Sequence, residues 1–211
     1  MSDNTTHNLI YVHDPMCSWC WGFRPLFDNL CRQLPQGVAV RRLLGGLAPD
    51  SDDPMSDDMQ RYLQATWKRI QQRIPGTRFN FDFWRNCRPR RSTWPACRAV
   101  IAARELDADK EAAMIDAIQR AYYLEAMNPS DEDTLIALAV RLGLDRHRFA
   151  ERLVDATTDA QLQREISEAH GMGADSFPSL RLTVGSTHWP VPIDYLHVEP
   201  MLETIEALRC A

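Results

Sequence analysis

Two cysteines, Cys17 and Cys20, stand two residues apart between a strand-like segment and a helix-like one, and this arrangement restricts the folds open to the chain. The apolar run 9–12 predicts a strand before them, and apolar residues at three- and four-residue steps over 23–34 predict a helix after them. Cys17 would open that helix, where free backbone N–H groups and the positive end of the helix dipole favour a thiolate over a thiol. Cys20 would follow about one turn later, within reach of a disulfide with Cys17. The pattern predicts a two-thiol redox centre.

A Cys-x-x-Cys pair is also half of a common zinc site. Such a site needs a second pair of close ligands, and no two of the other cysteines supply one: Cys31, Cys87, Cys97 and Cys210. We therefore expect no metal ion. Cys87 and Cys97 remain candidates for a second redox pair, whereas Cys31 falls on an apolar helical pattern that predicts a buried, inert thiol.

The composition predicts a globular protein with a substantial core, because 45% of the 211 residues are hydrophobic and 25% are charged. A net charge of −5 gives no basic footprint for nucleic acid, and no apolar run reaches the roughly 18 residues of a membrane span. Residues 1–8 are polar and lack the basic and apolar regions of a secretory signal. We therefore expect a cytoplasmic protein, without nucleic-acid or membrane partners, whose cysteines are mostly reduced.

Strand and helix signals alternate at the two ends of the chain and give way to helical signals in the middle. A second strand over 38–44 would complete a strand–helix–strand unit, with the cysteine pair at the carboxyl end of its first strand. Open α/β sheets usually carry their chemistry at that edge. A hairpin and a closing helix follow late in the chain. We predict an α/β fold in two segments, 1–50 and 157–211, interrupted by an all-helical insertion over 51–156.

Small polar residues mark the expected starts of the later helices, because their side chains can accept hydrogen bonds from free N–H groups there. The predicted caps are Ser56, Ser92 or Thr93, Ser130, Asp145, Asp159 and Asp194.

Three stretches carry a resemblance to a known family: Asp14-Pro15-x-Cys17-Ser18-Trp19-Cys20 with Trp21, Ser92-Thr93-x-x-Ala96-x-Arg98-Ala99, and Gly171-x-Gly173 followed by Phe177-Pro178. Over nearly its whole length the chain resembles the DsbA-like branch of the thioredoxin superfamily, above all its cytosolic DsbA-like and FrnE-like thiol-disulfide oxidoreductases. The resemblance implies a thioredoxin-like fold with a mixed central sheet and a helical insertion. One position departs from the expected pattern, since Cys97 stands where we expect a histidine.

The resemblance also implies roles for the residues of the site. Cys17 would be the nucleophile, Cys20 the resolving thiol, and Pro178 a cis-proline facing both. The backbone of Phe177 would pair with an extended substrate. Trp19 is a candidate platform for a peptide or a flat small substrate, with plain packing as the alternative.

Three further residues beside the cysteines are candidates for tuning the site: Asp14, His13 and Ser18. Asp14 either disfavours a nearby thiolate by like charge or serves a proton relay, or else it is a turn residue beside Pro15. His13 either tunes the site or is structural, and Ser18 lies between the cysteines, where it would influence the reduction potential.

We expect a protein-disulfide oxidoreductase, acting as reductase, isomerase or oxidase on protein or small-molecule thiols and disulfides. No bound cofactor is expected, with glutathione as a candidate co-substrate and glutathione or a thioredoxin system as redox partner. Two alternatives remain open. One is a glutathione-dependent transferase or isomerase of the kappa-class or chromene-carboxylate isomerase type, whose members typically have serine at the first cysteine. The other is a non-catalytic protein-binding module.

Overall fold

The computed structural model describes residues 7–210. Residues 1–6, on which most of the leader-sequence expectation rests, lie outside the described residues. Four strands form one sheet in the order β2-β1-β3-β4. The elements in chain order are β1 (His7–His13), α1 (Ser18–Gln33), β2 (Val38–Leu44), α2 (Asp57–Arg73), α3 (Phe83–Asn86), α4 (Trp94–Leu106), α5 (Lys110–Tyr123), α6 (Glu132–Arg141), α7 (Arg146–Leu153), α8 (Ala156–Gly171), β3 (Ser179–Val184), β4 (Thr187–Val191) and α9 (Glu199–Arg209).

The sheet is mixed, as the sequence predicted. β1 runs parallel to β2 and antiparallel to β3, so that Tyr11 lies opposite both Arg42 and Leu180. A tight turn at Gly185, whose φ of 60° suits glycine, joins β3 to the antiparallel β4. The predicted strand–helix–strand unit and the late hairpin are both confirmed.

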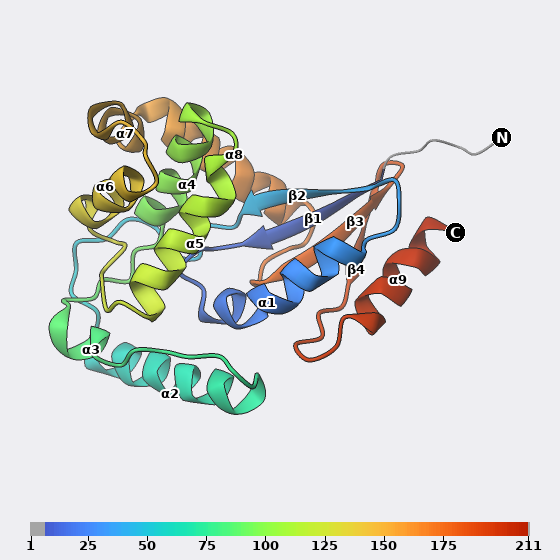
Figure 1. Ribbon diagram of the computed structural model, residues 1–211, viewed down its shortest axis with the longest axis horizontal. Helices are drawn as coiled ribbons and strands as arrows, with labels where there is room; N and C mark the ends of the chain where they lie inside the picture. The colour runs from blue at the N-terminus through green and yellow to red at the C-terminus, as the bar shows by residue number, and fades with distance from the viewer. Residues whose placement is uncertain (1–6, 211) are drawn as a thin grey trace.

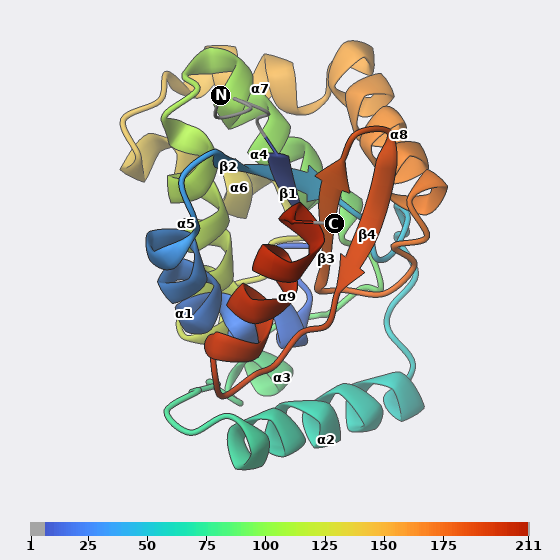
Figure 2. The same ribbon diagram turned by 90° about the vertical axis from the view of Figure 1, so that its right-hand side faces the viewer.

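The two faces of the sheet are covered by different helices (Figure 1, Figure 2). Leu9 and Tyr11 point to the face that packs on α1 and α9, because side chains alternate along a strand. Ile10 and Val12 point to the opposite face, where Ala169 of α8 lies. Burial of β1 on both faces explains why its sequence is a nearly continuous apolar run rather than an alternating one.

The helices from α2 to α7 lie between β2 and α8 in the sequence and share one large apolar cluster. α4 is central to this cluster and packs against α5, α6, α7 and α8. α2 lies along one end of the molecule and contacts α1 (Figure 2). The predicted boundary between residues 156 and 157 falls at the start of α8, which packs on both β2 and α4 and so joins the two parts.

Several of the predicted helix caps are confirmed. Ser56 accepts a hydrogen bond from the Met59 N–H at the start of α2, and Asp145 accepts one from the Arg148 N–H at the start of α7. Thr93 immediately precedes α4 as predicted, but its hydroxyl makes no capping bond.

Three predicted caps are wrong. Ser130 is not the residue before α6, and its hydroxyl donates instead to the Ser92 carbonyl at 2.7 Å. Asp159 lies inside α8, which begins earlier because Asp155 caps it. Asp194 accepts from two N–H groups of a turn, while α9 begins only at Glu199. Asp194 resembles a cap because it holds a local turn, whereas the cap of α8 is Asp155, one turn before Asp159.

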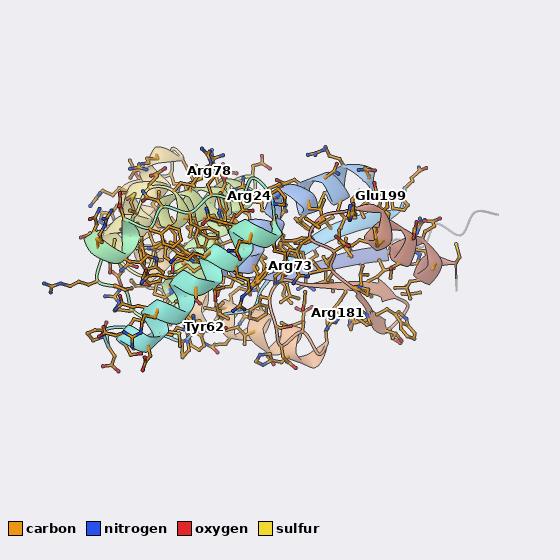
Figure 3. All side chains as sticks on the ribbon, turned by 90° about the horizontal axis from the view of Figure 1, so that it is seen from below. Arg24, Tyr62, Arg73, Arg78, Arg181 and Glu199 are labelled. Carbon is orange, nitrogen blue, oxygen red and sulfur yellow. The ribbon has the colours of Figure 1, made fainter. Side chains whose placement is uncertain are left out.

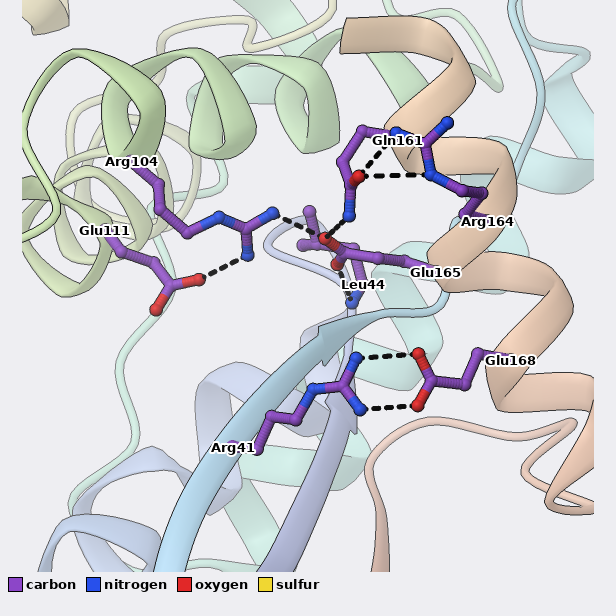
Figure 4. Close-up of polar contacts among 8 residues, drawn as sticks. All are labelled: Arg41, Leu44, Arg104, Glu111, Gln161, Arg164, Glu165 and Glu168. Carbon is purple, nitrogen blue, oxygen red and sulfur yellow. Dashed lines mark hydrogen bonds and ion pairs between the residues drawn. The ribbon is translucent and has the colours of Figure 1, made fainter. Parts of the chain in front are cut away.

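A buried carboxylate connects the end of β2 to the helices beside it (Figure 4). Glu165 of α8 is only 3% exposed, and it accepts from the Leu44 N–H at 2.9 Å and from Arg104 of α4 at 2.5 Å. Further along the same helix, Glu168 forms a two-bond ion pair with Arg41 that is open to solvent. Glu165 thus accepts a hydrogen bond from a backbone N–H at the sheet edge and connects β2 to α4 and α8. Among residues 7–210, no helix is both long and apolar enough to cross a membrane.

Candidate active site

Cys17 and Cys20 lie where the sequence placed them, at the start of α1. Cys17 has an extended backbone and immediately precedes the first helical residue, and its N–H donates to the Asp14 carbonyl at 3.0 Å. Both thiols are free. The Cys17 side chain is 6% exposed, whereas Cys20 is wholly buried one turn further in.

The buried sulfur of Cys20 has a crowded environment. Burial is the main cause that raises the pKa of the Cys20 thiol, the neighbouring Cys17 adds to it, and a backbone hydrogen bond from Asp14 opposes it. Burial likewise raises the pKa of the Tyr11 hydroxyl, which also hydrogen-bonds to Cys20. Cys20 therefore rests as a protonated thiol enclosed by protein groups.

Asp14 is wholly buried, and its carboxylate holds three segments together. One oxygen accepts from the Met16 N–H at 2.7 Å, which is the turn role expected beside a proline. The other accepts from the Leu47 N–H at 2.8 Å, from the Thr93 hydroxyl at 2.6 Å and from the Cys97 thiol at 3.5 Å. Burial raises the pKa of the Asp14 carboxyl, although these hydrogen bonds act in the opposite sense. Cys97, which stands where the family resemblance predicts a histidine, therefore donates a hydrogen bond to the buried carboxylate of Asp14.

The loop before β3 reaches the cysteine pair. The peptide bond between Phe177 and Pro178 is cis, the isomer expected from the sequence, and the proline is buried. The Cys17 thiol donates to the Phe177 carbonyl oxygen at 3.4 Å. That oxygen is thus occupied by Cys17 in the dithiol form, a contact that the sequence did not predict.

Ser18 connects the active-site helix to the helical block. Its hydroxyl accepts from the indole N–H of Trp67 at 2.9 Å, and both groups are buried. Trp67 lies on α2 at the centre of an aromatic cluster, stacked on Phe79 with ring centroids 4.8 Å apart. The first turn of α1 is therefore fixed to α2 by a specific hydrogen bond.

The two tryptophans of the motif have different surroundings. Trp19 packs against Tyr195, with ring centroids 5.1 Å apart. The guanidinium of Arg73 on α2, labelled in Figure 3, lies over both rings. Trp21 stacks on Tyr123 at 5.5 Å, and its indole N–H is bonded to a backbone carbonyl. Trp19 also borders a cavity beside Cys17, whereas Trp21 does not line that cavity.

His13 is 1% exposed and stacks on Tyr11 with ring centroids 4.9 Å apart. Neither ring nitrogen has a hydrogen-bond partner, and burial lowers the pKa of His13 to about 3. The histidine is therefore neutral at physiological pH and contributes a flat ring to the core.

A cavity of about 170 Å³ opens beside the Cys17 sulfur. α1 and the Phe177 loop form one side of it, and α2 contributes Tyr62 and Thr66 to another. The segment before α4 contributes Arg90 and Arg91. Sequence reasoning missed these four residues because no local pattern indicates that α2 and the segment before α4 lie beside residue 17.

Cys87 and Cys97 each have a separate hydrogen-bond partner. The Cys87 thiol donates to the Ala126 carbonyl at 3.1 Å, while Cys97 contacts Asp14. Cys31 is half-buried rather than buried as predicted, and this partial burial raises the pKa of its thiol. Within residues 7–210, no cluster of three or more His, Cys, Asp or Glu side chains is placed to hold a metal ion.

Comparison with known proteins relates this arrangement to a family. The profile of the DSBA-like thioredoxin domain matches residues 8–185. A candidate protein disulfide isomerase from Nitrosomonas europaea superposes with a TM-score of 0.83 at 25% identity, covering 96% of this chain and 97% of the other. The cytosolic disulfide reductase DsbM from Pseudomonas aeruginosa superposes with a TM-score of 0.74 at 29% identity, covering 97% and 100%.

Two further matches concern possible ligands and partners of those relatives. DsbM has also been solved with GSH, and that structure superposes with a TM-score of 0.70 at 27% identity, covering 96% of each chain. The ClpXP adapter protein SpxH from Halalkalibacterium halodurans is 23% identical over 170 residues, which are 79% of this chain. The match spans about half of that relative, 55% of its length.

Proposed function

We propose that this chain, which belongs to the DSBA-like thioredoxin domain family, exchanges thiols and disulfides through Cys17 and Cys20. The observation that carries the proposal is the unequal placement of the two sulfurs. Cys17 borders the cavity at the start of α1, and Cys20 lies wholly buried behind it. A substrate disulfide can therefore meet Cys17 first, and only then does Cys20 find a disulfide within reach.

The exchange proceeds in two substitutions at sulfur. The Cys17 thiolate attacks one sulfur of a substrate disulfide, the S–S bond breaks, and the first substrate thiolate leaves and takes up a proton. Cys20 then loses its proton and attacks the Cys17 sulfur, releasing the second substrate thiolate. One disulfide becomes two thiols, and the two electrons come from the dithiol, which ends as a Cys17–Cys20 disulfide. Two molecules of a low-molecular-weight thiol such as glutathione restore the dithiol and form their own disulfide.

The surrounding residues assist each sulfur differently. Free N–H groups in the first turn of α1 stabilise negative charge on Cys17. The Phe177 carbonyl holds the protonated form of the same thiol, and an arriving substrate can displace that bond. The backbone hydrogen bond from Asp14 favours the thiolate of Cys20 when it attacks. Trp19 lies at the cavity wall, where it can contact the substrate.

We propose further that the reaction runs as disulfide reduction in the cytoplasm, with glutathione as co-substrate. Support comes from DsbM, which is a cytosolic disulfide reductase and has been solved with GSH.

The decisive experiment is trapping with a Cys20→Ser variant. Exchange then stops after the first attack, so incubation with oxidised glutathione should leave close to one glutathione per chain, on Cys17, released by a reductant. Cys17→Ser is the matched control and should trap far less at the motif, because Cys20 is buried, and peptide mapping separates this adduct from any on the exposed Cys210. Equal trapping by both variants would overturn the assignment of nucleophile and resolver. If wild-type protein binds glutathione without ever forming a disulfide, the transferase or isomerase alternative holds instead.

A further inference from the structure

We infer that Arg91 forms a carboxylate-binding subsite beside Cys17, so that the preferred substrates are small disulfides with a carboxylate near the reacting sulfur. This inference rests on the proposed function and names its substrate class. It starts from the charges around the cavity. Among residues 7–210, Arg90 and Arg91 are the only charged residues that line it, and none of these residues contributes an acidic side chain.

The two arginines differ in whether their charge is already balanced. Arg90 forms an ion pair with Asp131 at 2.9 Å and also bonds to the Ser130 carbonyl. Arg91 has no carboxylate within ion-pair distance among residues 7–210, although it is half-buried. A partly buried guanidinium without a counter-charge is a favourable place for an incoming anion, and its planar fork suits a carboxylate.

The backbone around Arg91 is fixed by contacts with the segment after β2. The Met55 N–H donates to the Pro89 carbonyl at 2.8 Å, and the Ala48 carbonyl accepts from the Thr93 N–H at 3.0 Å. On the far side of Arg91, the buried Ser92 hydroxyl accepts from the Ser51 N–H at 3.3 Å. Because these bonds flank Arg91 on both sides, the residue lines the cavity from a constrained backbone, which lowers the cost of ordering it around a ligand.

The size of the cavity restricts what can bind. About 170 Å³ beside Cys17 accepts a small group rather than a folded surface. Tyr62 of α2, labelled in Figure 3, borders the same cavity and is 60% exposed. A substrate that places one sulfur on Cys17 and one carboxylate on Arg91 fits this space, whereas a bulky peptide would have to remain outside it.

The net charge of the protein opposes the binding of anions. A net charge of −5 should repel dianions, so any preference for them must come from a local cation. Three small disulfides that differ only in the end group serve as probes: dithiodipropionate (dianion), bis(2-hydroxyethyl) disulfide (neutral) and cystamine (dication). The measurement is the second-order rate constant for oxidation of the reduced full-length protein by each, at one pH and low salt.

We expect wild-type protein to be oxidised fastest by the dianion, and Arg91→Gln to lower the dianion-to-neutral rate ratio by about tenfold or more. Arg88→Gln is the matched control, because Arg88 is exposed on the same segment and lines no part of the cavity, and it should keep the wild-type ratio. Added salt should lower the wild-type ratio too, a readout that needs no variant. No dianion preference in wild type, or an equal loss with all three probes in Arg91→Gln, overturns the subsite while exchange itself stands. Failure of every probe to oxidise Cys17 and Cys20 overturns the proposed function and the subsite together.

Discussion

The aromatic ring of Phe177 lies directly against the backbone of Gly45. A Cβ atom placed on Gly45 would come within 2.1 Å of that ring, closer than any real contact. Gly45 follows β2, and its N–H donates to the His13 carbonyl at 2.8 Å, so it cannot shift without disturbing the sheet edge. The loop that brings the Phe177 carbonyl to Cys17 can therefore lie where it does only because Gly45, 132 residues earlier, has no side chain.

We expect Gly45→Ala to displace Phe177 and to lower the rate of disulfide exchange several-fold while the protein still folds. The rate of the first attack on a small disulfide measures this effect. Gly171→Ala is the control, because a Cβ there meets nothing within 4 Å. In a Phe177→Ala background the added methyl group should cost little further activity, and a full additional loss there would show that the two residues act independently.

Ser18→Ala should destabilise the protein by about 1–3 kcal/mol, because the buried indole N–H of Trp67 then lacks an acceptor. Urea unfolding followed by circular dichroism gives the free energy. A double-mutant cycle with Trp67→Phe isolates the bond, since the serine then has no indole to hold. Strictly additive losses in that cycle would mean that the bond contributes nothing.

His13→Phe should make the protein more resistant to acid. The pKa of His13 falls to about 3 in the folded state, whereas a histidine in the unfolded chain takes up a proton near its ordinary value of about 6.5. Between these values the unfolded state binds more protons, so wild type loses up to about 1.4 kcal/mol of unfolding free energy per pH unit as pH falls. The variant lacks this loss.

Stability measured from pH 7 to pH 3.5 checks the prediction. His147→Phe is the control, because the His147 side chain is 83% exposed and lies outside the core. If the free energy of unfolding falls equally with pH for wild type and His13→Phe, the expectation is refuted.

Glu165→Ala should cost about 3–5 kcal/mol of stability, because it leaves the Arg104 guanidinium and the Leu44 N–H without their buried acceptor. Glu168→Ala removes an ion pair on the same helix that is 38–48% exposed, and it should cost at most about 1 kcal/mol. Thermal or urea unfolding of the two variants side by side tests the contrast. Similar losses would mean that burial does not distinguish the two carboxylates.

Much of the fold follows from local signals. The apolar run ahead of Cys17, the glycine turn of the hairpin and the caps at Ser56 and Asp145 lie where the sequence placed them. These predictions succeeded because each depends on a few neighbouring residues. The cap at Asp159 failed for the same reason, since Asp155 offers an equivalent local signal four residues earlier.

The site was only half predictable. The thiols and the proline were indicated by type and spacing, but their supporting contacts join distant parts of the chain. Asp14 meets Thr93 and Cys97, and Ser18 meets Trp67. A carboxylate beside a proline predicts a turn, and nothing local indicates that its second oxygen reaches another helix. Such contacts depend on how helices pack, which periodicity alone does not specify.

The bond between the Cys17 thiol and the Phe177 carbonyl spans 160 residues of chain. During synthesis the two cysteines therefore emerge from the ribosome long before the residue that faces them, and β1 has only one of its two neighbouring strands until β3 is made. Contacts this distant in sequence form late and slow the folding of a domain. The nascent chain thus carries a thiol pair that the Phe177 loop does not yet cover.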